Sequence, residues 1–447
     1  MDAQSITEEF IRLVQSNPQK YYRDFLKIDQ EAKKENALYK DKPIPFLYQP
    51  MFFTPEDIDA FHQIGAMLYT IAEKVTQAFL TMPSFRQKFH YPDFLEELIL
   101  VDPGYEVSIP ISRYDLFYHS KDRFQFIEVN TDGTSGMNED NIFSRLLLDS
   151  LALQELQKDY RIDYFELMEK WVDESLQTYQ SFKWKRTDRP NIAIVDFMEA
   201  GITAEFEEIQ KIYVKRGYHA FLAEARELDY KDGVLTYKGT PIHMIYRRIV
   251  TGDLVRNIKE VTPLIEAYKD GAVCMIGSFR TQLMHNKMIF KILHDEDSLS
   301  IFTKEEKNFI QNHVPFTRSF KEDPVAYEKV LHHKDDYILK PVDSYASQGV
   351  NTGRDYDFAQ WKAIVDDCYG KDFLYQPFID PPTRKFVCFD ENGQVDVIDF
   401  KLNVGVTNYN EKFAGLYTRI STHNIIFGQS TYYSIPNMLV QAKEHKS

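Results

Sequence analysis

The feature that most constrains this sequence is a predicted β-hairpin in residues 111–136, ISRYDLFYHSKDRFQFIEVNTDGTSG. Its two strands, at 112–118 and 124–130, are joined by the turn-forming segment 119–122. Side chains alternate between the faces of a strand, and an even-numbered turn puts a polar set on one face: Arg113, Asp115, Glu128 and Asn130. The other face is hydrophobic and suits a core: Tyr114, Leu116, Tyr118, Ile127 and Val129.

The polar face of the hairpin carries the groups that a metal ion and a phosphate require. Mg²⁺ prefers carboxylate and carbonyl oxygens, and a guanidinium group binds phosphate or a developing oxyanion. A cluster of salt bridges on a solvated sheet face fits the same residues equally well. The hairpin alone therefore leaves two interpretations open, a metal–phosphate site and a structural ion-pair cluster.

Composition excludes several classes of protein. The 53 basic and 68 acidic residues give a net charge of −15, which argues against broad nucleic-acid binding. Cys274, Cys368 and Cys388 lie far apart, as expected for reduced thiols in a cytosolic protein and not for a disulfide framework or a zinc ribbon. The acidic N-terminus lacks an apolar signal core, and no run approaches the ~18 apolar residues of a membrane span. We expect a soluble cytoplasmic protein, with a homodimer as the default assembly.

The middle of the chain is predicted to contain a small parallel sheet. After helices at about 138–158 and 162–183, a β-α-β pattern begins with a buried strand at 191–196. Glu199 and Thr203 follow that strand, at the edge where open α/β sheets bind ligands.

A later strand, 243–248, ends in the pair Arg247-Arg248. Adjacent residues of a strand point to opposite faces, so only one of the two arginines faces a cleft. We assign Arg247 to the cleft, although the sequence does not decide between them.

The C-terminal third is rich in predicted strands that carry basic residues. Lys340 lies in the strand 337–341, before a loop of small residues that contains Gly349. A lysine in this position places a point charge on a phosphate while loop amides cover it. Lys287 lies in a predicted helix at 279–294, where a lysine is usually only solvated surface. The remaining predicted strands are 373–379, 385–390, 395–402 and 417–420, the last of which carries Arg419.

In combination, these segments resemble the glutathionylspermidine synthetase-like, circularly permuted ATP-grasp family. RYDLFY and FIEVNTDGTS are similar to the family's hairpin, and the later segments follow in its order: HMIYRR, HNK, YILKP, YQPF and GLYTRIS. The likeness covers residues 95 to 425. It implies an α/β (α+β) class and a circularly permuted ATP-grasp fold, with a helical N-terminal region and a small parallel α/β subdomain. The expected division is a helical region at 1–95, the hairpin with its helices at 96–185, a substrate-side subdomain at 186–275 and a nucleotide-binding portion at 276–447.

The resemblance also implies roles for the candidate residues, with ATP and Mg²⁺ as cofactors. The metal-binding positions are matched by Asp115, Glu128 and Asn130, and a phosphate-contacting arginine by Arg113. The nucleotide phosphates would be held by Lys287 and Lys340, with Gly349 in the covering loop. The hinge beside adenine would be formed by residues 376–378, including Gln376 and Phe378. Arg419 matches an arginine that stabilises the transferring phosphoryl group or the acyl phosphate. Substrate would be held by Ser135, Glu199, Thr203 and Arg247.

The activity that this resemblance implies is an ATP-dependent carboxylate–amine ligase. A carboxylate is a poor electrophile, and phosphorylation converts it into an acyl phosphate that an amine can attack. The expected substrates are a small-molecule or peptide carboxylate and an amine, and no nucleic-acid or membrane partner is expected. A small-molecule kinase and a non-catalytic ATP-binding module stay open as alternatives. A hydrolase is less favoured, because no Ser/His or Cys/His arrangement is evident.

Overall fold

The computed structural model describes residues 2–39, 42–199, 203–321, 323–344, 347–426 and 432–443. A six-stranded antiparallel sheet lies at its centre, in the order β21-β20-β19-β4-β5 with β18 paired to β19. Its strands are β4 (Ile111–Ser120), β5 (Arg123–Asn130), β18 (Thr383–Phe389), β19 (Val395–Tyr409), β20 (Lys412–Ser421) and β21 (Tyr433–Ile435). The β4 strand of the predicted hairpin therefore pairs with β19, which lies almost 300 residues later in the chain. The β19 strand is also much longer than the predicted strand at 395–402.

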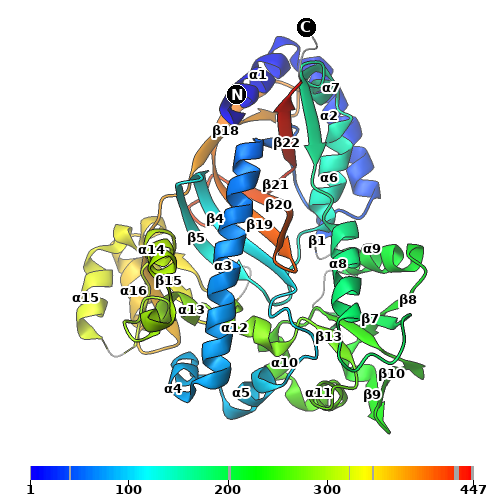
Figure 1. Cartoon of the computed structure of the whole chain (residues 1–447). Helices are drawn as coiled ribbons and strands as arrows, with labels where there is room; N and C mark the ends of the chain where they lie inside the picture. The colour runs from blue at the N-terminus through cyan, green and yellow to red at the C-terminus, as the bar shows by residue number, and fades with distance from the viewer. Residues whose placement is uncertain are drawn as a thin grey trace.

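The long helix α3 (Pro55–Thr81) crosses one face of the central sheet (Figure 1). It begins with a capping box, in which Thr54 accepts a hydrogen bond from the Asp57 amide and the Asp57 carboxylate accepts one from the Thr54 amide. Its apolar residues recur every three or four positions, so one stripe of the helix is buried against the sheet. The two short helices that follow are α4 (Pro83–Arg86) and α5 (Asp93–Leu100).

A parallel sheet in the order β13-β12-β7-β8 confirms the small α/β subdomain expected from the sequence. Its strands are β7 (Asn191–Asp196), β8 (His219–Glu224), β12 (Met244–Arg247) and β13 (Cys274–Ile276), with the crossover helix α9 (Thr203–Lys215) between the first two. A separate antiparallel sheet contains β9 (Leu228–Lys231), β10 (Val234–Tyr237) and β11 (Thr240–Pro241). Two helices, α10 (Thr251–Arg256) and α11 (Thr262–Lys269), follow β12.

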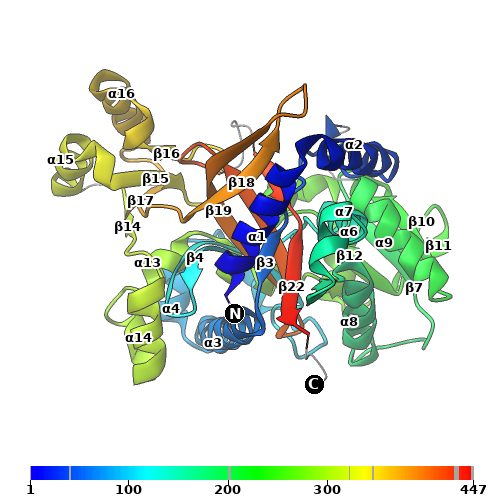
Figure 2. The same cartoon turned by 90° about the horizontal axis from the view of Figure 1, so that it is seen from above.

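A third unit projects from the side of the central sheet that lies opposite the parallel sheet, as the view in Figure 2 shows. Its antiparallel sheet has the order β14-β17-β15-β16, formed by β14 (Arg318–Ser319), β15 (Tyr337–Pro341), β16 (Asn351–Thr352) and β17 (Phe373–Pro377). It is accompanied by α14 (Lys304–His313), α15 (Pro324–His332) and α16 (Phe358–Cys368). Trp361 of α16 is fully buried in the small core of this unit, with Leu339 of β15.

A further sheet joins three distant parts of the chain in the order β3-β22-β6. It joins β3 (Met51–Phe53), β6 (Tyr160–Tyr164) and β22 (Asn437–Ala442), near α1 (Ala3–Ser16), α2 (Pro18–Lys34), α6 (Asn138–Leu148) and α7 (Leu151–Leu156). A further strand pair is β1 (Leu38–Tyr39) with β2 (Lys42–Pro43).

The division of the chain into four regions, at 1–95, 96–185, 186–275 and 276–447, stays a prediction.

Two predicted helices were wrong in this part of the chain. Residues 160–164 form β6 and not the start of a helix, and α8 (Met168–Gln180) begins only after it. The partner of β6 is β22, at the far end of the chain, so local sequence gave no sign of the pairing. The helix predicted at 138–158 is divided where Ser150 caps α7 by accepting a hydrogen bond from the Leu153 amide. No helix in the described part of the chain is long and apolar enough to cross a membrane.

Candidate active site

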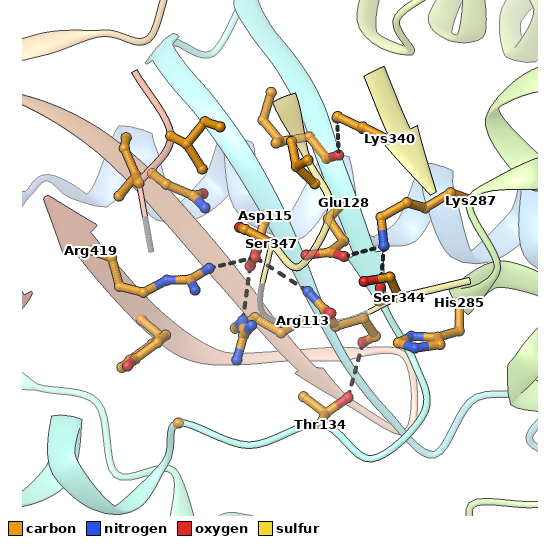
Figure 3. A pocket seen from close by; sticks show the side chains of 18 of the residues that line it. Arg113, Asp115, Glu128, Thr134, His285, Lys287, Lys340, Ser344, Ser347 and Arg419 are labelled. Atoms are coloured by element: carbon orange, nitrogen blue, oxygen red, sulfur yellow. Dashed lines mark hydrogen bonds and ion pairs between the residues drawn. The ribbon is translucent and has the colours of Figure 1, made fainter. Parts of the chain in front are cut away.

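The β4–β5 hairpin brings its predicted polar residues together. Arg113 lies directly opposite Asn130, and Asp115 lies directly opposite Glu128. Directly opposed residues of an antiparallel pair share a face, so all of them point to the same side of the sheet. This side lines a cavity of about 290 Å³ between the central sheet, the parallel sheet and the β15–β17 unit (Figure 3).

The hydrophobic face of the hairpin differs from the prediction at one position. The register shifts between Asp115 and Leu116, so Leu116 pairs with Phe126 and Ile127 is the extra residue of a β-bulge. Phe126 is consequently fully buried in the main core, where Ile127 was expected. Ile127 lines the cavity instead. A bulge reverses the alternation of side chains, and its position cannot be read from the alternation itself.

Two ion-pair groups occupy the polar face. The Asp115 carboxylate accepts hydrogen bonds from Arg113 Nε at 2.8 Å, Arg419 Nη2 at 2.6 Å and Asn130 Nδ2 at 3.2 Å. Glu128 Oε1 lies 2.8 Å from Lys287 Nζ. Figure 3 shows the two groups side by side across the hairpin. The ion pairs of the second interpretation are therefore present, but they line a cavity and not a solvated sheet face. The metal–phosphate site stays a prediction.

Lys287 reaches the cavity because the helix predicted at 279–294 is broken. The structure has α12 (Gln282–His285) and α13 (Met288–Ile292), with Lys287 at the start of α13. The Lys287 amide donates a hydrogen bond to the carbonyl of Val342 at 3.0 Å, next to the end of β15. The same strand carries Lys340, whose Nζ donates to the carbonyl of Ile127 at 3.2 Å. Both lysines therefore extend from different elements to the same side of the cavity.

The other end of the cavity is mainly apolar and follows β17. Gln376 and Phe378 line it, with Ile338, Pro315 and Ile379 around them, and their role as a hinge beside adenine stays a prediction. The Gln376 Nε2 atom donates to Thr317 Oγ1 at 2.7 Å, which fixes the side chain. Gly349 does not line the cavity, although its neighbour Val350 does. Gly349 has φ +72°, and a Cβ there would lie 2.8 Å from Pro341 Cγ, so this turn requires glycine.

Burial and the neighbouring charges together lower the pKa values of both Glu128 and Lys340. Burial alone would raise the pKa of Glu128, but Lys287 and its neighbours outweigh burial and lower it to about 2. Burial lowers the pKa of Lys340 to about 8, against the opposing attraction of Glu128. Below pH 8 the site thus holds the ionised Glu128 carboxylate and a protonated Lys340.

We expect nucleotide affinity to fall as the pH rises through about 8, because Lys340 then loses its proton. A phosphate favours the protonated form, so the affinity should decrease by up to about tenfold per pH unit above this value. Equilibrium binding of a fluorescent ATP analogue between pH 6.5 and 9.5 measures the effect. In Lys340→Arg the charge does not titrate in this range, and the affinity should stay flat. The same slope in this variant as in the wild type would contradict the assignment.

The predicted substrate residues are separated by the fold. Ser135 lines the cavity, and its carbonyl accepts a hydrogen bond from Arg113. Glu199 lies at the surface, 2.6 Å from Arg226, and Thr203 begins α9; neither lines the cavity. The assignment of Arg247 to the cleft does not agree with the structure.

Arg247 is fully buried, with its Nη2 2.6 Å from Asp132 Oδ1, and Arg248 lines the cavity in its place. The two arginines point to opposite sides, as expected for neighbours at a strand end. The Arg248 guanidinium lies 3.5 Å from Glu205 and over the ring of Phe206. Arg247 instead holds the 132–136 loop on the parallel sheet through Asp132.

Several cavity residues were not predicted. Glu139 of α6 accepts a hydrogen bond from the Tyr417 hydroxyl at 2.8 Å, and Asp196 ends β7. Burial raises the pKa of both carboxyls, and Glu205 raises that of Glu139 further. Asp196 could have been found from its place at the end of a parallel strand, but Glu139 lies within a helical pattern that carries no such signal.

The hairpin residues fit a magnesium ion by their chemistry. Asp115, Glu128 and Asn130 supply carboxylate and amide oxygens from rigid strand positions. Among the described residues, no group of three His, Cys, Asp or Glu side chains could hold a metal ion. An ion at the hairpin therefore needs the Asn130 oxygen, with phosphate or water oxygens completing its shell.

Comparison with known proteins finds similarity in three-dimensional structure and none in sequence families. No protein-family model matches the sequence, and no curated protein does. Among solved structures, a glutathione synthetase-like effector from Globodera pallida is similar, with a TM-score of 0.56 and 11% identity, covering 94% of this chain and 97% of that one. A protein provisionally described as a γ-glutamylcysteine synthetase from Methylobacillus flagellatus KT has a TM-score of 0.43 and 10% identity, covering 83% and 87%.

A more distant likeness is to D-alanyl-alanine synthetase A from Vibrio cholerae, with a TM-score of 0.31 and 12% identity, covering 57% of this chain and 89% of that one. At these identities the similarity concerns the fold alone. The chain has the mixed α/β, ATP-grasp-like fold that its sequence predicts.

Proposed function

We propose that this protein is an ATP-dependent carboxylate–amine ligase that acts through an acyl phosphate. The observation that carries the proposal is the convergence of two arginines and two lysines with Asp115 and Glu128 at one end of a cavity. The apolar end along β17 suits a nucleotide base. A nucleotide bound there would place its phosphates against the charged residues of the hairpin.

The first step requires alignment and charge neutralisation more than covalent chemistry. Lys287 and Lys340 would hold phosphate oxygens from two sides. Mg²⁺, held by Asp115, Glu128 and Asn130, would supply further charge neutralisation when bound. Arg113 and Arg419, already fixed by Asp115, would be oriented toward the transferring phosphoryl group, so little reorganisation is needed.

The second step joins the activated carboxylate to an amine. The amine nitrogen forms a bond to the acyl carbon, and phosphate leaves with the electrons of the broken C–O bond. Arg419 would stabilise the oxyanion of the tetrahedral intermediate, and Arg248 would bind a carboxylate of the acyl substrate at the far side of the cavity. Candidate acids are amino acids and small peptides, and glutathione with spermidine is one pair to test.

The cytoplasmic location and the homodimer stay predictions from the sequence.

The test uses hydroxylamine as a general acceptor, since it converts acyl phosphates into hydroxamates. We expect one class of carboxylate to give ATP-dependent hydroxamate and stoichiometric ADP. ADP release in the absence of an acceptor should stay at least tenfold slower. A stable phosphorylated product by ³¹P NMR would instead establish the kinase alternative. Nucleotide binding without ADP release for any acid would support the non-catalytic alternative.

A further inference from the structure

A second cavity of about 250 Å³ adjoins the phosphate end of the first. Val250, His285 and Ser344 line both cavities, so the two are neighbours separated by these side chains. Its other boundaries include Arg256 of α10 and Asp343, which follows β15. The proposed mechanism leaves this second cavity without a role, yet it lies beside Lys287, where the acyl phosphate would form.

The charges around the second cavity favour a cation. Arg256 is paired with Asp253, so its charge is already balanced. Asp343 accepts a hydrogen bond from Gln282 Nε2 at 3.3 Å and makes no ion pair within the described part of the chain. A carboxylate beside a partly enclosed cavity, with only an amide for a partner, attracts a cationic group.

The space beside Asp343 depends on a glycine. A Cβ at Gly252 would lie 3.3 Å from Asp343 Oδ2 and 3.5 Å from Arg256 Nη1. Gly252 lies in α10, and a helical backbone does not require glycine there. Its absent side chain therefore keeps open the space between the two charged residues.

His285 lies at the boundary of the two cavities. It is only 7% exposed, and its Nδ1 atom is buried with no hydrogen-bond partner among the described residues. Figure 3 shows its ring below Lys287 and close to Ser344. The His285 ring lines both cavities, and a neutral imidazole has one nitrogen that can accept a proton from a ligand bound beside it.

We infer that the second cavity binds the amine substrate as an ammonium ion against Asp343, and that His285 removes its proton. This inference rests on the proposed ligase function. The reaction is R–NH₃⁺ with R′–CO–OPO₃²⁻, giving R′–CO–NH–R, HPO₄²⁻ and one H⁺. His285 takes the first proton and thereby frees the nitrogen lone pair. The C–N bond then forms, the C–O bond to phosphate breaks, and the departing phosphate takes the second proton.

Binding is tested with n-butylammonium, a simple cation, and with n-butanol as its neutral counterpart. Saturation-transfer NMR on the full chain with ADP and Mg²⁺ should show binding of the cation and not of the alcohol. Asp343→Asn should weaken cation binding at least tenfold, and Gly252→Ala should do so by filling the space. Asp372→Asn, an exposed aspartate outside both cavities, is the matched control and should bind like the wild type. No cation binding, or equal binding by Asp343→Asn, would overturn the inference.

Catalysis provides the second test and separates this inference from the proposed function. With an acid that gives hydroxamate, His285→Gln should lower the transfer to n-butylamine by about 10²-fold. Transfer to hydroxylamine, which is neutral near pH 7 and carries no extra proton to lose before attack, should fall by a much smaller factor than transfer to n-butylamine. Equal rates for n-butylamine in variant and wild type would remove the role of His285. Absence of hydroxamate for every acid would count against the ligase function itself, whereas the binding test would still decide the amine site.

Discussion

Replacing Arg419 with lysine should lower the turnover number of the proposed ligase reaction by about 10²–10³-fold, the usual effect of removing one donor from a preorganised anion site. Lysine keeps the positive charge and can still pair with Asp115, so the fold should be retained. It lacks the planar fork through which a guanidinium binds Asp115 and a phosphoryl oxygen simultaneously. The measurement is steady-state ADP release at saturating ATP, acid and hydroxylamine, together with the KM for ATP.

The KM for ATP should change by less than the turnover number, because Lys287 and Lys340, the proposed phosphate ligands, are left in place. Arg384→Lys provides the matched control: it lies on β18 of the same sheet and does not line the cavity. It should retain wild-type turnover. A wild-type rate in Arg419→Lys would show that Arg419 only anchors Asp115 and does not act on the transferring group.

ATP and Mg²⁺ should stabilise the protein strongly together and only weakly when added separately. ATP alone would take Lys287 from Glu128 and leave the carboxylate unpaired, and Mg²⁺ alone would leave the lysine unpaired. Breaking a buried ion pair by removing one partner typically costs about 3–5 kcal/mol. Joint binding gives each group a new partner. At 100 times its Kd, the metal–nucleotide complex should add about 2.7 kcal/mol to the free energy of unfolding.

Thermal unfolding with each ligand and with both measures this coupling, and Glu128→Gln isolates its origin. In this variant Lys287 has no carboxylate to leave, so ATP alone should bind at least as well as in the wild type, and Mg²⁺ should add little. The control is Glu306→Gln, which breaks a comparable pair at 2.7 Å, with Lys74, outside the cavity. It should lower stability and keep the coupling. Additive wild-type shifts would contradict the coupled site.

The sequence by itself determined which polar residues share a face of the hairpin. The alternation in the hairpin placed Arg113, Asp115, Glu128 and Asn130 together, and β4 and β5 confirm this because opposed residues of a strand pair are neighbours. The small parallel sheet was equally evident, since β-α-β units are encoded within short stretches of chain.

Only the tertiary structure decided which distant strands pair and which side chains reach the cavity. The pairing of β6 with β22 and of β4 with β19 joins distant segments, so neither partner is specified by its own neighbourhood. The bulge that turns Ile127 into the cavity, and the break that frees Lys287 from a helix, depend on packing against other elements. The choice between Arg247 and Arg248 was likewise made by Asp132, a buried carboxylate from another loop that only the folded chain brings to 2.6 Å from Arg247.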